Sequence, residues 1–196
     1  MLITASANDF LTIFVGIELS AFSSYGLVAF RKTDDKSTEA GAKYLLIGAF
    51  SSALTLYGIS LLYALTGSVT FEGVNAFLTG IDNGVIDGDF NELIFISSLF
   101  IIAGLGFKIA VVPFHAWAPD VYEGAPTPVT ALLAAASKAM GFVALFKVFI
   151  FTLEPFSDEW SLVLGIIALV SMTIGNLAAL SQKDIGRMLA YSSIAQ

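Results

Sequence analysis

The chain has 196 residues, of which 57% are hydrophobic and only 13% charged, and its formal net charge is −7 at pH 7. It contains no cysteine, which excludes disulfides, thiolate metal sites and cysteine-held iron–sulfur clusters in this chain. No basic cluster indicates nucleic-acid binding, and apolar runs of about 20 residues or more match the hydrocarbon core of a bilayer. The composition therefore predicts an all-α polytopic membrane protein.

Five apolar runs are long enough to cross a membrane as helices. They cover about residues 8–30, 40–66, 93–114, 127–153 and 160–181, and another helix starts near Gly186. The first residues lack the basic segment of a signal peptide, and the sequence stops at Gln196 inside that last helix. We therefore expect a fragment of a longer protein, with five transmembrane helices and the start of a sixth.

The charges in the connectors predict the orientation of these helices. Lys and Arg occur in the first connector and after the fifth run, at Arg31, Lys32, Lys36, Lys183 and Arg187, whereas the connectors at 67–92 and 154–159 are acidic. Because basic connectors mark the cytoplasmic side, we expect the N-terminus outside. Alternation alone then places the third connector, around Asp120 and Glu123, on the inside.

The connector at 67–92 is rich in glycine and acidic residues. Its Asp82-Asn83-Gly84 and Asp87-Gly88-Asp89 segments suggest calcium ligands, but their spacing does not fit an EF-hand loop. A solvated extracytoplasmic loop is the prediction for this stretch.

The third run leads into a proline-rich segment. Four prolines occur within 16 residues, at Pro113, Pro119, Pro126 and Pro128. Because proline removes a backbone donor and collides with the preceding turn, no regular helix continues through this segment. Such broken helices line ion paths in transporters. Gly104 and Gly106 do not form a nucleotide-binding motif, because a third glycine and a preceding strand are absent.

Three charged residues lie deep inside the apolar runs: Glu18, Lys108 and Lys138. Placing a charge at the centre of a membrane helix costs about 2.5–3.5 kcal/mol on insertion scales. Such a charge therefore indicates an ionic partner, a water-filled path or a function. Each has a plain alternative: Lys108 extends to the interface, Lys138 forms a structural ion pair, and Glu18 is protonated and hydrogen-bonded. Together they favour proton or ion movement, with Lys108 as the expected partner of Glu18.

Other titratable residues carry weaker signals. Lys43 follows Glu39 by four residues, so an ordinary helical ion pair explains it as well as a functional role does. Lys147 is expected to extend to the outer interface. His115, the only histidine, either passes protons between a buried lysine and water or fixes the turn after Pro113.

Several motifs resemble one known family. Gly106-Phe107-Lys108, Pro113-Phe114-His115-Ala116-Trp117 and the stretch Pro119 to Val129 are similar to the antiporter-like membrane subunits of respiratory complex I, in particular the subunit N (subunit 2) group. The segments Ser37–Leu45 and Arg187–Ile194 fit the same group, so the resemblance spans nearly the whole chain.

The resemblance implies a 14-helix subunit with two inverted five-helix repeats. Residues 1–182 would form the first repeat, and 183–196 the junction and the start of the next helix. The family's roles fall on Glu18 and Lys108 as the controlling pair, Lys138 as the central lysine, His115 as the channel histidine, Lys43 as an additional lysine and Tyr191 near the junction.

The resemblance also implies the function and the partners. The expectation is a proton-translocating subunit of NADH–quinone oxidoreductase in a bacterial plasma membrane, in which redox events elsewhere weaken the Glu18–Lys108 interaction. NADH or another donor, FMN, iron–sulfur clusters and quinone would belong to the whole complex, and none of them to this chain. Other membrane subunits and lipid would be its partners. Two alternatives remain: a subunit of a cation/proton antiporter, and a structural subunit without a proton path.

Overall fold

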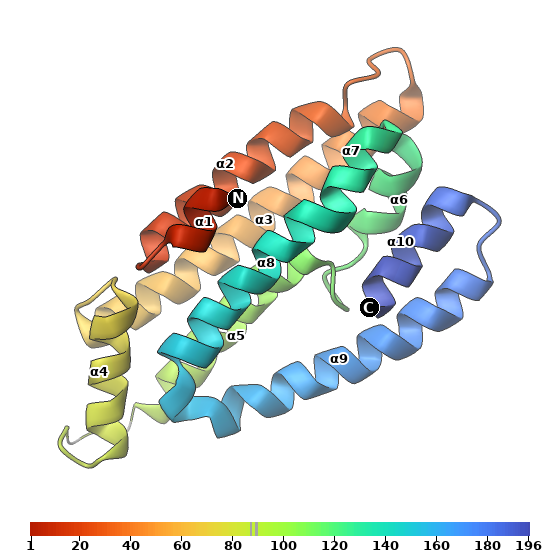
Figure 1. Ribbon diagram of the computed structural model, residues 1–196. Helices are drawn as coiled ribbons and strands as arrows, with labels where there is room; N and C mark the ends of the chain where they lie inside the picture. Colours follow the sequence, from red (N-terminus) through yellow and green to blue (C-terminus); the bar gives the residue numbers. More distant parts are fainter. Residues whose placement is uncertain (87, 89) are drawn as a thin grey trace.

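The structure is a computed structural model that describes residues 1–86, 88 and 90–196. Helices make up most of the described chain (Figure 1). In chain order they are α1 (Leu2–Ser6), α2 (Phe10–Val28), α3 (Asp35–Thr66), α4 (Phe71–Asp82), α5 (Asn91–Ile109), α6 (Trp117–Gly124), α7 (Thr127–Leu132), η1 (Leu133–Ser137), α8 (Lys138–Leu145), η2 (Phe146–Thr152), η3 (Glu154–Phe156), α9 (Ser157–Leu180) and α10 (Ile185–Ala195).

Five helical stretches are long and apolar enough to cross a membrane, which confirms the predicted class. They are α2, α3, α5, the continuous stretch Thr127–Thr152 and the stretch Glu154–Leu180. The chain is thus an integral, multi-pass membrane protein. The additional helix α10 lies where the sequence predicted a further helix.

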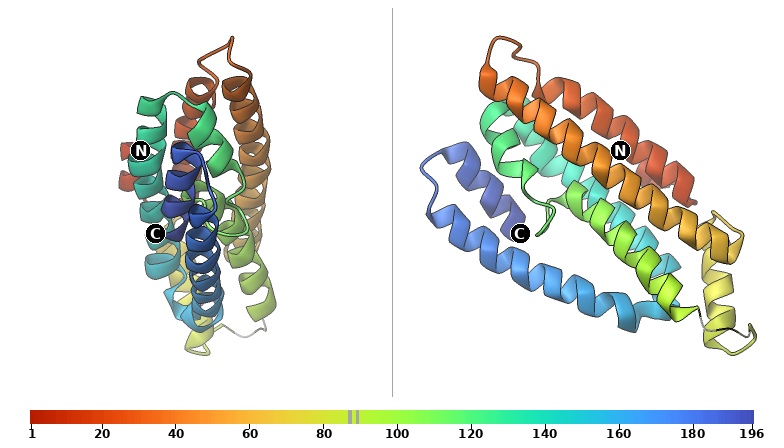
Figure 2. Two further views of the ribbon diagram at one scale, coloured as in Figure 1. Left: turned by 90° about the vertical axis from the view of Figure 1, so that its right-hand side faces the viewer. Right: turned by 180° about the vertical axis from the view of Figure 1, so that it is seen from behind.

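The helices form a bundle with one outlying hairpin. Figures 1 and 2 show α2, α3, α5 and the α7–α8 stretch side by side, while α9 runs along one side and α10 folds back between α9 and α6. Since α9 keeps most of its apolar side chains exposed, this face is suited to lipid or to protein outside the described chain.

Local sequence explains where several helices begin and end. The side chains of Asp9, Asp34, Thr70 and Asp184 accept hydrogen bonds from backbone N–H groups in the first turns of α2, α3, α4 and α10. These caps satisfy donors that a helix leaves free at its start. At the end of α3, Gly67 takes the left-handed conformation that favours glycine.

The loop predicted at 67–92 was wrong over much of its length, because α4 occupies Phe71–Asp82. Thr70 caps this helix, and its Val74 and Leu78 side chains are buried against the rest of the bundle. A buried apolar stripe at helical spacing therefore outweighed the turn-forming residues around it. The calcium interpretation rested partly on Asp87 and Asp89, which lie outside the described residues.

The stretch Thr127–Thr152 is a continuous but uneven helix. Two π-helical segments, η1 and η2, interrupt it, and Lys138 is the first residue after η1. Lys147, which we expected at the outer interface, lies in η2 and donates a hydrogen bond to the Ala7 carbonyl at 2.6 Å. It therefore binds the end of α1.

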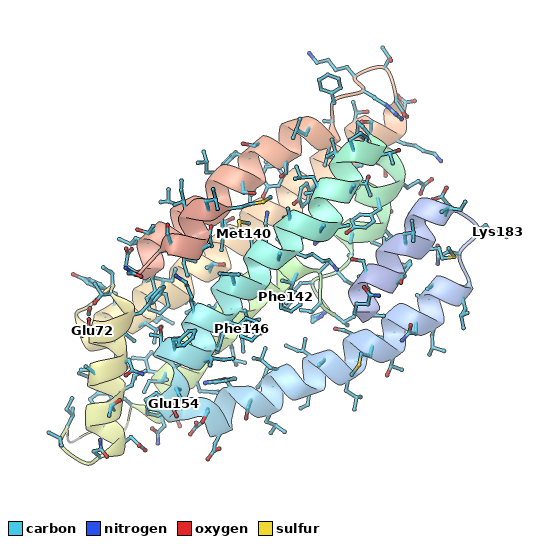
Figure 3. The ribbon with its side chains drawn as sticks, viewed as in Figure 1. Glu72, Met140, Phe142, Phe146, Glu154 and Lys183 are labelled. Carbon is cyan, nitrogen blue, oxygen red and sulfur yellow. The ribbon has the colours of Figure 1, made fainter. Side chains whose placement is uncertain are left out.

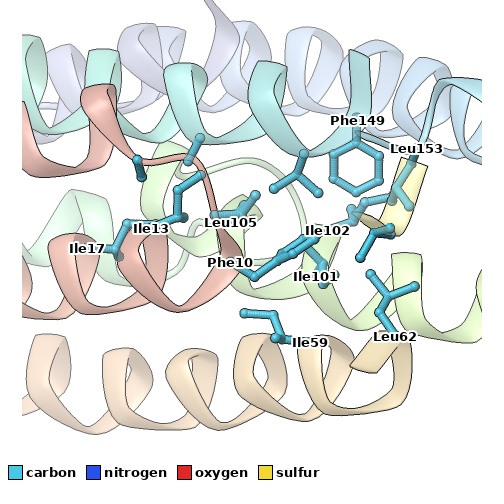
Figure 4. Close-up of a cluster of buried hydrophobic side chains, with 14 of the residues drawn as sticks. Phe10, Ile13, Ile17, Ile59, Leu62, Ile101, Ile102, Leu105, Phe149 and Leu153 are labelled. Atoms are coloured by element: carbon cyan, nitrogen blue, oxygen red, sulfur yellow. The ribbon is translucent and has the colours of Figure 1, made fainter. Parts of the chain in front are cut away.

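One of two apolar clusters fills the half of the bundle away from the proline-rich connector. Figure 4 shows its side chains from α2, α3, α5 and η2, including Phe10, Ile101 and Phe149. Figure 3 shows Glu72 and Glu154 at one end of the molecule and Lys183 at the other. The acidic and basic connectors thus lie at opposite ends, as the orientation argument requires.

Candidate functional site

Lys108 is buried in the last turn of α5. Its side chain is 2% exposed, and its Nζ has no hydrogen-bond partner among the described residues. The opposing residue on α8 is Gly141, where an added Cβ would come within 3.4 Å of Lys108 Cγ and 2.6 Å of Ile109. The glycine therefore lets α8 approach α5 closely at the lysine.

Lys138 lies on α8, the helix that packs against Lys108. It is 9% exposed, and its ammonium donates a hydrogen bond to the main-chain carbonyl of Ser193 in α10. It also lines a cavity of about 340 Å³ between α5, α8, α9 and α10, together with Val111, Ser171 and Ser193.

Glu18 does not form the direct ion pair with Lys108 that the sequence led us to expect. Its carboxylate accepts a hydrogen bond from the Ser52 hydroxyl of α3 at 2.5 Å, and no ion pair within 4.0 Å joins it to a cation in the described chain. A serine on the neighbouring helix satisfies the carboxylate instead. Lys108 and Lys138 thus lie on two helices that pack together, whereas Glu18 forms no ion pair with either lysine.

The predicted break in the third membrane helix is present. Helix α5 ends at Ile109, five residues earlier than expected, because Ala110 takes a left-handed φ of 61°. The backbone N–H of Val112 donates to the Ser171 hydroxyl of α9, and the Trp117 indole donates to the Phe107 carbonyl. These bonds satisfy polar groups that the break exposes, as a membrane interior demands.

Helix resumes sooner than the proline content suggested. Pro119 lies in the first turn of α6, and Pro128 in the first turn of α7. The first turn of a helix tolerates proline, because its N–H groups have no partner within the helix. The proline-rich connector is therefore a turn and a two-turn helix, where we had expected no regular helix.

His115 lies in the turn between α5 and α6. Its Nδ1 is buried without a hydrogen-bond partner in the described chain, and its ring centroid lies 6.5 Å from that of Tyr191 on α10. Burial lowers the pKa of His115, and the nearby Pro113 main chain offsets this only partly. The structure thus brings together the predicted His115 and Tyr191.

Five charged residues bind the connectors to one another at this end of the molecule. Lys43 pairs with Asp120 at 2.6 Å as well as with Glu39 at 2.7 Å, so the helical pair is only part of its environment. Arg187 bridges Asp120 at 2.6 Å and Glu123 at 3.1 Å, and Lys36 pairs with Glu123 at 2.6 Å. We call Lys36, Lys43, Asp120, Glu123 and Arg187 the connector cluster. It confirms that the third connector lies at the same end as the basic ones.

The connector cluster keeps its carboxylates ionised. Burial raises the pKa of Asp120, but hydrogen bonds from Lys43 and Arg187 outweigh burial and hold that pKa below its ordinary value. Hydrogen bonds from Lys36 and Arg187 likewise lower the pKa of Glu123. The cluster therefore acts as a set of mutually neutralised charges that ties α6 to α3 and α10.

Sequence reasoning missed several polar contacts of this site. Asp120, Glu123 and Arg187 were visible only as connector charges, although the three-residue spacing of Asp120 and Glu123 indicates one helix face. Ser52 and Ser193 gave no signal, because serine is common in membrane helices. Within residues 1–86, 88 and 90–196, no group of three or more His, Cys, Asp and Glu side chains is arranged to hold a metal ion.

Comparison with known proteins agrees with this arrangement. Residues 7–196 match the family described as "NADH:quinone oxidoreductase/Mrp antiporter, TM". The chain is 47% identical over 196 residues to subunit N of an NADH-quinone oxidoreductase from Desulforamulus reducens, and it spans 40% of that relative's length.

Solved structures share the fold. A chain in the structure of respiratory complex I from Thermus thermophilus with bound aureothin is 36% identical, with a TM-score of 0.80 over 98% of this chain and 39% of that chain. A chain of the Mrp complex from Dietzia sp. is 22% identical, with a TM-score of 0.81 over 96% and 34%, and this likeness concerns the fold alone. The chain therefore belongs to the NADH:quinone oxidoreductase/Mrp antiporter family of transmembrane proteins.

Proposed function

We propose that the chain is part of a proton-translocating membrane subunit of an NADH–quinone oxidoreductase. One observation carries the proposal: Lys108 is 2% exposed, has no hydrogen-bond partner in the described chain, and packs against the helix that bears Lys138. An unpaired buried cation destabilises a membrane helix, so a purely structural origin does not explain it. The 47% identity to a subunit N supports the assignment to the oxidoreductase.

In this proposal, Glu18, Lys108, Lys138, His115, Lys43 and Tyr191 are the proton-transfer candidates. Residues 1–182 form the first helix repeat, and 183–196 begin the next part of a longer subunit. Lys108 passes a proton toward Lys138, while Glu18, which accepts a hydrogen bond from Ser52, influences Lys108 through its negative charge. Lys43 lies in the connector cluster and influences proton transfer at the cytoplasmic end of the path through its charge.

The complex as a whole would supply the rest of the activity. Electron donor, FMN, iron–sulfur clusters and quinone belong to other subunits in this proposal, and the exposed apolar face of α9 is available to neighbouring membrane subunits or lipid. Translocating one elementary charge against 100 mV requires about 2.3 kcal/mol. A change of two units in a lysine pKa corresponds to about 2.7 kcal/mol, so switching a buried lysine has the required magnitude.

Two other functions make different predictions. A cation/proton antiporter subunit shares the family, but its likeness at 22% identity supports the fold only. A structural subunit would use the buried lysines to hold helices together. Both alternatives predict that quinone-linked proton pumping does not depend on Lys138.

The test is proton pumping by inverted membrane vesicles that contain the full complex with Lys138→Ala. We expect pumping to fall at least about tenfold while the amount of assembled complex stays near the native level. Lys183→Ala, which removes an exposed lysine, is the matched control and keeps native pumping. Native pumping in the Lys138→Ala complex would contradict the proposal.

A further inference from the structure

Ser52 of α3 has two hydrogen-bond acceptors within reach and one proton to offer them. Its hydroxyl oxygen lies 2.5 Å from a carboxylate oxygen of Glu18 on α2 and 3.0 Å from the carbonyl oxygen of Gly48, one turn earlier in α3. A serine hydroxyl carries a single O–H donor, so it serves one of these acceptors fully at a time. A serine inside a helix commonly bonds to the carbonyl four residues earlier. Ser52 therefore keeps an acceptor when it releases Glu18.

The neighbouring serine, Ser51, binds the helix on the other side of α3. Its hydroxyl donates to the Gly104 carbonyl of α5 at 2.9 Å. Lys108 follows Gly104 by four residues, so it lies one turn further along the same face of α5. The two consecutive serines thus connect α3 both to the helix that carries Glu18 and to the helix that carries Lys108.

Glu18 and Lys108 adjoin the same apolar cluster. Figure 4 shows Ile17 and Leu105 toward one end of that cluster, and these residues lie one and three positions before Glu18 and Lys108. Glu18 is close enough to act electrostatically on Lys108, although the two form no ion pair. The Lys108 ammonium has no hydrogen-bond partner in the described chain. The fold thus holds a carboxylate on a serine while a lysine within its electrostatic reach stays unpaired.

We propose that Ser52 is a positioning residue that holds Glu18 away from Lys108 while Lys108 gives up its proton. The inference rests on the proposed function and adds the group that competes with Lys108 for the carboxylate. In the present arrangement the Ser52 hydroxyl donates to Glu18, and Lys108 has no counter-ion. In the alternative arrangement the Ser52 hydroxyl turns to the Gly48 carbonyl, and Glu18 pairs with Lys108.

The two arrangements are balanced in a way that suits a switch. A hydroxyl bonds more strongly to a carboxylate than to a neutral carbonyl, so Ser52 stabilises the arrangement in which Glu18 is held on α3. An ion pair between Glu18 and Lys108 gains Coulomb attraction but loses solvation, and inside a protein these two contributions largely offset each other. A change of charge elsewhere in the complex is then able to shift the population from one arrangement to the other.

The first test measures proton pumping by the assembled complex with Ser52→Ala or Ser52→Thr. Alanine removes the competing donor, so Glu18 stays with Lys108 and the lysine keeps its proton. Losing a hydrogen bond to a charged group then predicts that the pumping rate falls about tenfold. Threonine keeps a hydroxyl at this position and should restore most of the native rate.

The matched control is Ser60→Ala. Ser60 is an exposed serine of the same helix, and its hydroxyl donates to the Tyr57 carbonyl within α3. This variant should pump at the native rate. The amount of intact complex is measured for every variant, and rates are compared at equal amounts.

The second test observes the Glu18 carboxyl group directly. Infrared difference spectra between the oxidised and the reduced complex should contain a carboxyl band that Glu18→Gln removes. Because the stretching frequency of a carboxyl group depends on its hydrogen bonds, this band should be displaced in Ser52→Ala. It should keep its native position in Ser52→Thr and in Ser60→Ala.

Three results would overturn the inference. A native spectrum without a Glu18 band, or a band that Ser52→Ala leaves in place, would show that Ser52 does not control the carboxylate. Native pumping by Ser52→Ala despite a displaced band would show that the bond has no part in proton transfer. Equal loss of pumping in Ser52→Ala and Ser52→Thr would mean that packing, rather than the hydroxyl, matters. In each case Lys138→Ala tests the proposed function separately, since lost pumping supports it and native pumping contradicts it.

Discussion

Lys108 and Lys138 differ in how the fold satisfies them. Lys138 has a main-chain carbonyl and an adjoining cavity, whereas the Lys108 ammonium has no hydrogen-bond partner in the described chain. Leaving a buried polar group unsatisfied costs about 1–3 kcal/mol, and more when the group is charged. Lys108 is thus the residue whose charge the fold tolerates least, which fits a group that releases its proton.

Asp120 gives a prediction about pH. Its pKa is lower in the folded chain than in the unfolded chain, so its stabilising effect is fully present above the unfolded value of about 3.9 and is lost as pH falls through the folded value. In the native protein we expect Asp120 to leave the melting temperature of the purified complex unchanged between pH 7 and about pH 5, and the melting temperature to fall as the pH drops below about 4. The Asp120→Asn complex should have a lower melting temperature than the native complex at pH 7, because its ion pairs with Lys43 and Arg187 are absent. For the same reason its melting temperature should fall less on acidification.

Asp82→Asn is the control for this measurement, because it removes the same charge from an exposed position without an ion pair in the described chain. Its melting curve should follow the native one at each pH. Identical pH profiles for native and Asp120→Asn complexes would show that the connector cluster does not stabilise the fold.

The break between α5 and α6 is held by two neighbouring helices, α3 and α9. Tyr44 of α3 stacks on Trp117 of α6 with ring centroids 4.6 Å apart and on Phe107 of α5 at 5.8 Å. Ser171 of α9 binds the backbone at Val112. Such fixed surroundings allow an irregular backbone to persist inside a membrane protein, and they position the end of α5 where Lys108 lies.

The contact of α8 with α5 depends on Gly141. In Gly141→Ala the new methyl would meet Ile109 at 2.6 Å, so the helices must separate next to Lys108. Overpacking of this kind costs about 1–3 kcal/mol, and we expect a lower melting temperature together with slower pumping. Gly165→Ala on α9, where an added Cβ meets nothing within 4 Å, should leave both unchanged or slightly raise stability. Equal melting temperatures for the two variants would contradict this view of the helix contact.

Much of the fold could be predicted from the lengths of the apolar runs and the positions of the helix-breaking residues. The five membrane helices and the break after Lys108 were predictable, because long apolar runs and prolines act locally. Helix α4 was not, since its stability comes from burying Val74 and Leu78 against distant segments. The bond from Ser52 to Glu18 and the contact of Tyr122 with Ser193 join residues 34 and 71 positions apart, and no local pattern encodes such pairs.

At the scale of the whole molecule, two roles are considered for the buried lysines. They either transfer protons or hold helices together (helix locking). Lys138→Ala removes the positive charge and the exchangeable proton together. This variant alone therefore does not separate proton transfer from helix locking. Lys138→Arg keeps a positive charge and hydrogen-bond donors at the same position but gives up no proton, because the guanidinium pKa is far above that of an ammonium group and arginine stays protonated.

The decisive measurement is therefore the rate of proton pumping by inverted vesicles with the Lys138→Arg complex, at matched amounts of assembled complex. A proton path through Lys138 predicts that pumping falls at least about tenfold although assembly and thermal stability stay near native. Native pumping with a permanently charged residue at position 138 would contradict proton transfer by this lysine and leave it a role in holding α8 to α10.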